Sequence, residues 1–174
     1  MNKGFTVKKI VVGGIIAAIY AAASLALAPI SFGAVQFRVA EALTLLPVLS
    51  AEAVLGVTIG CAITNAAGVF LGANILGPVD IVLGSAATLI AAILTRLLAK
   101  YRLKGLPILA ALPPVLVNAV VIGGELMWAT SGGQWNTAAF GLFAGQVALG
   151  QLFACFGLGL PLLKMLEKTK LFEK

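Results

Sequence analysis

The chain has 174 residues, of which 61% are hydrophobic and 10% are charged. Soluble domains carry about 25% charged residues and disordered chains are poor in apolar ones, so the composition excludes both classes. The composition therefore indicates a protein that is embedded in the lipid bilayer. A helix needs about 20 apolar residues to cross a bilayer, so a chain of this length can form about five or six such helices and leaves no room for a separate soluble domain.

The sequence also lacks residues on which several enzyme classes depend. It contains no histidine, the commonest general base and zinc ligand, and we predict neither a metal nor a cofactor. Cys61 and Cys155 each lie in an apolar run and are expected to be small buried packing residues. No Gly-x4-Gly-Lys-Ser/Thr run is present, so any work driven by ATP would need a partner that supplies the ATPase.

Six apolar segments are predicted to form one all-α, polytopic membrane domain over residues 1–174. In chain order they cover 10–30, 39–50, 53–71, 79–98, 106–128 and 138–163. The second segment is short for a full crossing. Asp80 lies in the first turn of the fourth, where a negative charge complements the helix dipole. Pro113 and Pro114 are expected to kink the fifth.

The first segment has an alternative interpretation as a signal peptide, because it follows basic residues and contains Ala26-Leu27-Ala28. We favour a membrane helix, since the run is long for a signal core and the rest of the chain is equally apolar.

Basic residues gather near the ends of these segments. Eleven of the twelve fall on one side of a six-span topology: Lys3, Lys8, Lys9, Arg96, Lys100, Arg102, Lys104, Lys164, Lys168, Lys170 and Lys174. Only Arg38 falls on the other. Because cytoplasmic loops are rich in Lys and Arg, both termini are predicted to be cytoplasmic. The net charge of +6 is therefore a topology signal, and we predict no nucleic-acid binding.

Polar side chains inside a membrane are costly, so each is a candidate for function. In the predicted topology they gather in the outer half of the membrane: Gln36, Arg38, Glu41, Asn65, Asn74, Asp80, Asn118, Glu125 and Gln146. An aqueous pore would need polar residues through both halves. The pattern instead predicts a blind pocket that opens to the outside.

The fifth segment supports this pocket. Asn118 and Glu125 are seven residues apart and share a helix face, and Trp128 lies one turn beyond Glu125. The outer loop 130–137 adds Trp135 as part of a lid.

A purely structural role is the alternative for each of these residues. Arg38 and Glu41 are three residues apart and can pair with each other. Asn65 and Asn118 can bridge helices, and the two tryptophans can anchor the chain at the membrane interface.

Small residues four apart mark faces on which another helix can lie close. The first segment has two such pairs, Ala17/Ala21 and Ala18/Ala22. Further pairs, expected to serve packing within the chain, are Gly56/Gly60, Gly68/Gly72 and Gly141/Gly145.

The run from Phe32 to Pro47 reads Phe-Gly-Ala-Val-Gln-Phe-Arg-Val-Ala-Glu-Ala-Leu-Thr-Leu-Leu-Pro. It resembles the signature of the QueT family, and the chain length and predicted spans agree. QueT proteins are substrate-binding (S) components of energy-coupling factor (ECF) transporters, assigned to queuosine precursors. The resemblance implies an S-component bundle in the bacterial plasma membrane that binds its substrate at the outer face and is not an enzyme.

The resemblance also implies partners. S components dock through an Ala-x3-Ala face of the first helix on a transmembrane coupling subunit, and two cytoplasmic ATPases complete the complex. Both alanine pairs of the first segment match this pattern, so the register of docking stays open.

A 7-deazaguanine ligand makes chemical sense of the polar residues. Its ring N–H and amino group lie side by side, and a carboxylate accepts both. Glu41 and Glu125 are the candidates, with Glu125 favoured by its place beside Trp128. Donors to the ring carbonyl would be Gln36, Asn118 or Arg38, and stacking partners would be Trp128, Trp135 or Phe37. A cationic aminomethyl group would pair with Asp80 or the second glutamate. Asn65 and Gln146 complete the predicted substrate-binding set.

Three other functions stay open. The chain could be an S component for another vitamin or nucleobase, or a solitary ion-coupled carrier in which Asp80 or Glu125 titrates. An intramembrane enzyme is disfavoured, since histidine is absent and the inner half holds no obvious Ser/Lys or paired-Asp site.

Overall fold

The computed structural model describes residues 7–32 and 37–169, which are helical and form no strand. The elements in chain order are α1 (Val7–Ala26), α2 (Ala28–Ser31), η1 (Val39–Val48), α3 (Glu52–Phe70), α4 (Val79–Leu98), η2 (Ile108–Ala111), α5 (Leu112–Thr130), α6 (Thr137–Leu152), η3 (Phe153–Gly159) and α7 (Leu160–Lys168). η1 and η2 are 3₁₀-helices and η3 is a π-helix. The expected all-helical membrane bundle is confirmed.

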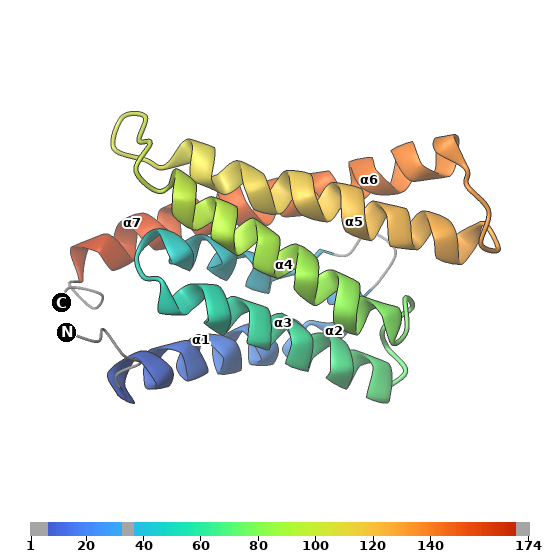
Figure 1. Ribbon diagram of the computed structural model, residues 1–174, viewed down its shortest axis with the longest axis horizontal. Helices are drawn as coiled ribbons and strands as arrows, with labels where there is room; N and C mark the ends of the chain where they lie inside the picture. The colour runs from blue at the N-terminus through green and yellow to red at the C-terminus, as the bar shows by residue number, and fades with distance from the viewer. Residues whose placement is uncertain (1–6, 33–36, 170–174) are drawn as a thin grey trace.

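The long helices run side by side along one axis (Figure 1). The start of α1, the connection between α4 and α5, and the end of α7 lie at one end of the bundle. The α3–α4 and α5–α6 connections lie at the other end. The chain therefore carries its described basic residues, apart from Arg38, at a single end, as the sequence predicted.

Five helical stretches are long and apolar enough to cross a membrane: Val7–Ala26, Glu52–Phe70, Val79–Leu98, Ile108–Thr130 and Thr137–Lys168. The expected second crossing, 39–50, is the ten-residue 3₁₀-helix η1. A 3₁₀-helix rises about 2.0 Å per residue, so η1 is about 20 Å long, against about 30 Å of hydrocarbon. η1 packs against η3, α4, α1 and α3, so it traverses the bundle interior without spanning a membrane by its own length.

The two prolines of the fifth segment lie at the start of an α-helix and not in its interior. Pro113 and Pro114 lie in the first turn of α5 and follow η2. Proline is tolerated there because the first backbone N–H groups of a helix have no partner within it. The sixth segment is also irregular, because the π-helix η3 separates α6 from α7.

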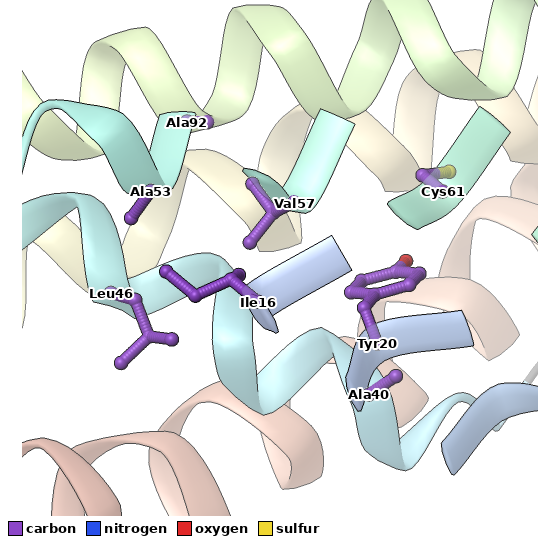
Figure 2. Close-up of a cluster of buried hydrophobic side chains, with 8 residues drawn as sticks. All are labelled: Ile16, Tyr20, Ala40, Leu46, Ala53, Val57, Cys61 and Ala92. Carbon is purple, nitrogen blue, oxygen red and sulfur yellow. The ribbon is translucent and has the colours of Figure 1, made fainter. Parts of the chain in front are cut away.

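The main core lies where α1, α3, η1 and α4 meet. Figure 2 shows its buried side chains: Ile16, Tyr20, Ala40, Leu46, Ala53, Val57, Cys61 and Ala92. α1 approaches α3 closely because α3 has glycines on the facing side. A Cβ at Gly60 would lie 2.8 Å from the Tyr20 Cβ and 3.0 Å from the Ala17 carbonyl oxygen. The expected packing role is thus confirmed for Gly56/Gly60, but it is wrong for Gly141/Gly145, where nothing lies within 4 Å of an added Cβ.

This contact predicts that Gly60→Ala destabilises the isolated protein. The added methyl group overpacks the α1–α3 interface, which should lower the free energy of unfolding by about 1–3 kcal/mol. The measurement is thermal unfolding in one detergent. Gly141→Ala is the matched control, because nothing lies within 4 Å of a Cβ there and alanine favours a helix over glycine by about 1 kcal/mol. Equal unfolding temperatures for the two variants would contradict the packing described.

Candidate substrate-binding site

A buried ion pair joins the segment before η1 to the start of α4. The Arg38 guanidinium lies 3.2 Å from Asp80 Oδ2, and the two side chains are 5% and 0% exposed. Asn74 donates to the same oxygen at 2.7 Å. Arg38 also donates from Nε to the Ser31 carbonyl oxygen at 3.1 Å. A charge at this depth is tolerated only when it is paired and hydrogen-bonded, and both conditions hold for Arg38.

A glycine makes room for the Asp80 carboxylate. A Cβ at Gly84, one turn further along α4, would lie 2.1 Å from Asp80 Oδ1 and 2.8 Å from Asn65 Nδ2. Asn65 donates to the Asp80 backbone carbonyl at 2.8 Å, which ties α3 to α4. Sequence reasoning missed Gly84, although a glycine four residues after an intramembrane aspartate on the same helix face was the available signal.

Glu41 lies beside this ion pair and has neutral partners. Its side chain is 2% exposed. The Tyr20 hydroxyl donates to Oε1, and Asn118 Nδ2 donates to Oε2 at 3.4 Å. The expected alternative of an Arg38–Glu41 ion pair is wrong, because Arg38 pairs with Asp80. Tyr20 was not predicted as part of the site, since an aromatic residue in an apolar helix gives no polar signal.

A small cavity lies among these residues. It measures about 10 Å³ and is lined by Arg38, Glu41, Gly84, Thr88, Asn118, Ile122, Val147 and Gln151. That volume holds about one water molecule, so a heterocycle can enter only if the lining side chains move apart. The lining comes from η1, α4, α5, α6 and the segment before η1, so this polar cavity lies where most of the bundle converges.

A second hollow, the α4–α5 recess, is larger and mainly apolar. Its volume is about 500 Å³, and its lining consists of Leu76, Val79, Leu83, Val121, Gly124, Glu125, Trp128 and Ala129. α5 thus presents Asn118 to the polar cavity and Glu125 to the recess. The two residues share a helix face, as expected, but line different hollows.

A family model described as QueT transporter matches residues 10–168. The chain belongs to the QueT transporter family. It is therefore a membrane transport protein, and the resemblance drawn from its sequence is confirmed. Comparisons with curated proteins and with solved structures gave no match.

The signature residues of this QueT protein contribute to the packing of η1 as well as to the polar network. Arg38 and Glu41 supply the buried network, and Ala42 is buried where its carbonyl oxygen would lie 3.0 Å from a Cβ at Gly159. At the other end of η1, Arg96 donates to the Pro47 and Val48 carbonyl oxygens, each at 3.0 Å. The signature therefore specifies both the polar side chains and the close packing of η1.

The other predicted site residues lie further out. Phe37 packs against Phe153, with ring centroids 4.9 Å apart. Trp135 is exposed, lies near Phe140 and donates to the Thr137 hydroxyl at 3.0 Å. Gln146 is half-buried and is not in the lining of either hollow. Gln36 falls outside the described residues. The buried positions of both cysteines are confirmed.

The ion pair predicts strong coupling between Arg38 and Asp80. Removing one partner leaves a buried charge, so Asp80→Asn or Arg38→Gln should each lower the free energy of unfolding by about 3–5 kcal/mol. The double variant should be less destabilised than the sum of the two by about 0.5–3 kcal/mol. Unfolding in mixed SDS–detergent micelles measures all four proteins. Strictly additive losses would show that the pair does not act as a unit.

Proposed function

We propose that this QueT-family protein is the substrate-binding S component of an ECF-type importer and that it binds a queuosine precursor, a 7-deazaguanine, in the polar cavity. The observation that carries the proposal is the buried Glu41 carboxylate, which is held by Tyr20 and Asn118 and forms no ion pair among the described residues. A neutral amide at 3.4 Å is a weak partner that a better donor can replace.

The edge of a 7-deazaguanine is such a donor. Its ring N–H and amino group present two parallel hydrogens, and hydrogen bonds to a carboxylate are roughly twice as strong as neutral ones. Glu41 would accept both hydrogens while keeping the Tyr20 bond. Asn118, released from Glu41, would donate to the ring carbonyl, and Thr88 and Gln151 would meet the rest of the ring. This assignment prefers Glu41 to Glu125 as the residue that binds the pyrimidine edge.

The membrane orientation follows the charge distribution. The end of the bundle that holds Lys8, Lys9 and Arg96 would face the cytoplasm of a bacterial cell, in keeping with the excess of Lys and Arg in cytoplasmic loops. The opposite end, with Asn74 and Asp80, would face outward. The polar cavity would then receive its ligand from outside the cell.

Helix α1 would dock on the coupling subunit through the Ala18/Ala22 register. Ala17 and Ala21 are buried in the bundle, whereas Ala18 and Ala22 are exposed. Gly14, four residues before Ala18, has nothing within 4 Å of a Cβ position. The exposed small residues form a smooth face of the kind that membrane helices pack against. The ATPases would join the complex through that subunit, because the chain has no P-loop of its own.

The first prediction from this proposal concerns Glu41. Glu41→Gln should weaken binding of a 7-deazaguanine by about 10- to 100-fold, because a hydrogen bond to a charged group contributes about 1.5–3 kcal/mol and 1.4 kcal/mol is tenfold in affinity. Tryptophan fluorescence of the purified protein measures the titration. The matched control is Glu167→Gln, a glutamate that pairs with Arg102 at the opposite end and should leave affinity unchanged.

Three outcomes would overturn parts of the proposal. Unchanged affinity of Glu41→Gln would remove the carboxylate from the site. Saturable binding of biotin, thiamin or riboflavin instead would keep an S component and discard the substrate. Uptake that needs an ion gradient and no ATPase would favour a solitary carrier.

The second prediction concerns docking. Ala18→Leu should abolish co-purification with the coupling subunit while leaving the unfolding temperature of the isolated protein unchanged, because a leucine there fills the smooth face and touches no neighbouring helix. Ala86→Leu, which alters an exposed alanine of α4, is the control and should still co-purify. Normal complex formation by Ala18→Leu would exclude this register.

A further inference from the structure

Buried oxygen atoms with no hydrogen-bond donor gather around Asp80. Asp80 Oδ1, Asn65 Oδ1 and both carboxylate oxygens of Glu125 have no partner among the described residues. Asp80 and Asn65 are fully buried, and Val79, the residue before Asp80, lines the same recess as Glu125. These atoms are all acceptors, so they cannot satisfy one another. An unsatisfied buried polar group is unfavourable by about 1–3 kcal/mol, and a ligand rich in N–H donors would relieve it.

Acidic groups outnumber basic groups in this part of the bundle. Asp80, Glu41 and Glu125 are three carboxyl groups, and Arg38 is the one basic residue beside them in the described ranges. The other described ion pairs, Lys9–Glu52 and Arg102–Glu167, involve different carboxylates. An ionised carboxylate without a cation is unfavourable at membrane depth, so this surplus of carboxyl groups favours a cationic ligand over a neutral one.

The α4–α5 recess has the shape and chemistry for an amine. Leu76, Val79 and Leu83 form apolar walls, and Glu125 is the charged residue in its lining. The indole of Trp128 lines the same recess, and the face of an indole attracts an ammonium group. About 500 Å³ falls in the range of small-molecule sites.

The spacing along α5 sets the length that one ligand would need to reach both hollows. Asn118, which contacts Glu41, is seven residues before Glu125, a rise of roughly 10.5 Å along α5. A bicyclic heterocycle with a one-carbon arm covers this separation when each end forms a hydrogen bond of about 2.9 Å.

We propose that Glu125, supported by Asp80, binds a protonated amine on the arm of the ligand, so that the protein selects a 7-aminomethyl-7-deazaguanine over a neutral 7-substituted one. This inference rests on the proposed function and assigns Glu41 and Glu125 to opposite ends of one ligand. Glu125 therefore determines which 7-deazaguanine is bound, while Glu41 recognises the ring that all of them share.

The test is calorimetric titration of wild type, Glu125→Gln and the control Glu167→Gln with two ligands, 7-aminomethyl- and 7-cyano-7-deazaguanine. Glu125→Gln should lose about 10- to 100-fold in affinity for the aminomethyl ligand, the range for a hydrogen bond between charged groups. It should bind the nitrile as the wild type does, which also shows that the variant is folded. Glu167→Gln should match the wild type with both ligands.

A second titration needs no variant. The 7-hydroxymethyl ligand is close in size to the aminomethyl one but neutral, and wild-type protein should bind it at least about tenfold more weakly, equivalent to about 1.4 kcal/mol. Equal affinity for these two ligands would overturn the inference, as would an equal loss by Glu125→Gln for aminomethyl and nitrile. Each of those results leaves the proposed function intact. If wild-type protein binds no 7-deazaguanine at all, the proposed function itself fails.

Discussion

A guanidinium group buried in an apolar bundle must have a counter-charge. The contacts at the end of the bundle where α4 begins are arranged around this requirement. Arg38 finds its counter-charge in Asp80, and Asp80 in turn is held by Asn74. Asn65 fixes the backbone of the same aspartate. Buried ion pairs add little net stability compared with apolar residues of the same size. Their effect here is positional, because the pair fixes where η1 begins and so where Glu41 lies.

The two irregular helices lie against each other beside the polar cavity. η1 packs on η3, and the contact is close enough that a Cβ at Gly159 would lie 2.8 Å from a Leu45 methyl carbon. Cys155 Sγ lies 3.8 Å from the Glu41 carbonyl oxygen and 3.7 Å from Gln151 Oε1. π-helical turns occur frequently at functional sites. In this protein the π-helix supports the element that carries Glu41.

Much of this arrangement can be predicted from the sequence, because polar residues are rare in membrane-spanning segments and each one is a candidate for function. The apolar segments fixed the fold class, and the scarcity of charge singled out Arg38, Glu41, Asp80 and Asn118 before any packing was known. The family signature then connected two of these residues to a transport family. These inferences depend on composition and position along the chain, which are visible without contacts.

The pairing of the polar residues did not follow. Local spacing suggested that Arg38 meets Glu41, three residues away, but its partner is 42 residues away in sequence. A shared face of α5 suggested one site for Asn118 and Glu125, yet the two residues line different hollows. Tyr20 gave no signal, because its importance comes only from what packs against it. The type of helix could not be predicted from the sequence either, because 3₁₀-helices and α-helices in a bundle contain the same kinds of apolar residue.

The most direct test of the account is the structure of the protein with a 7-deazaguanine bound. The account predicts that the Glu41 carboxylate accepts from the ring N–H and amino group, that Asn118 has left Glu41, and that the Arg38–Asp80 pair is intact beside an enlarged cavity. A ligand bound elsewhere, with Glu41 still held by Tyr20 and Asn118 around a cavity of about 10 Å³, would contradict it.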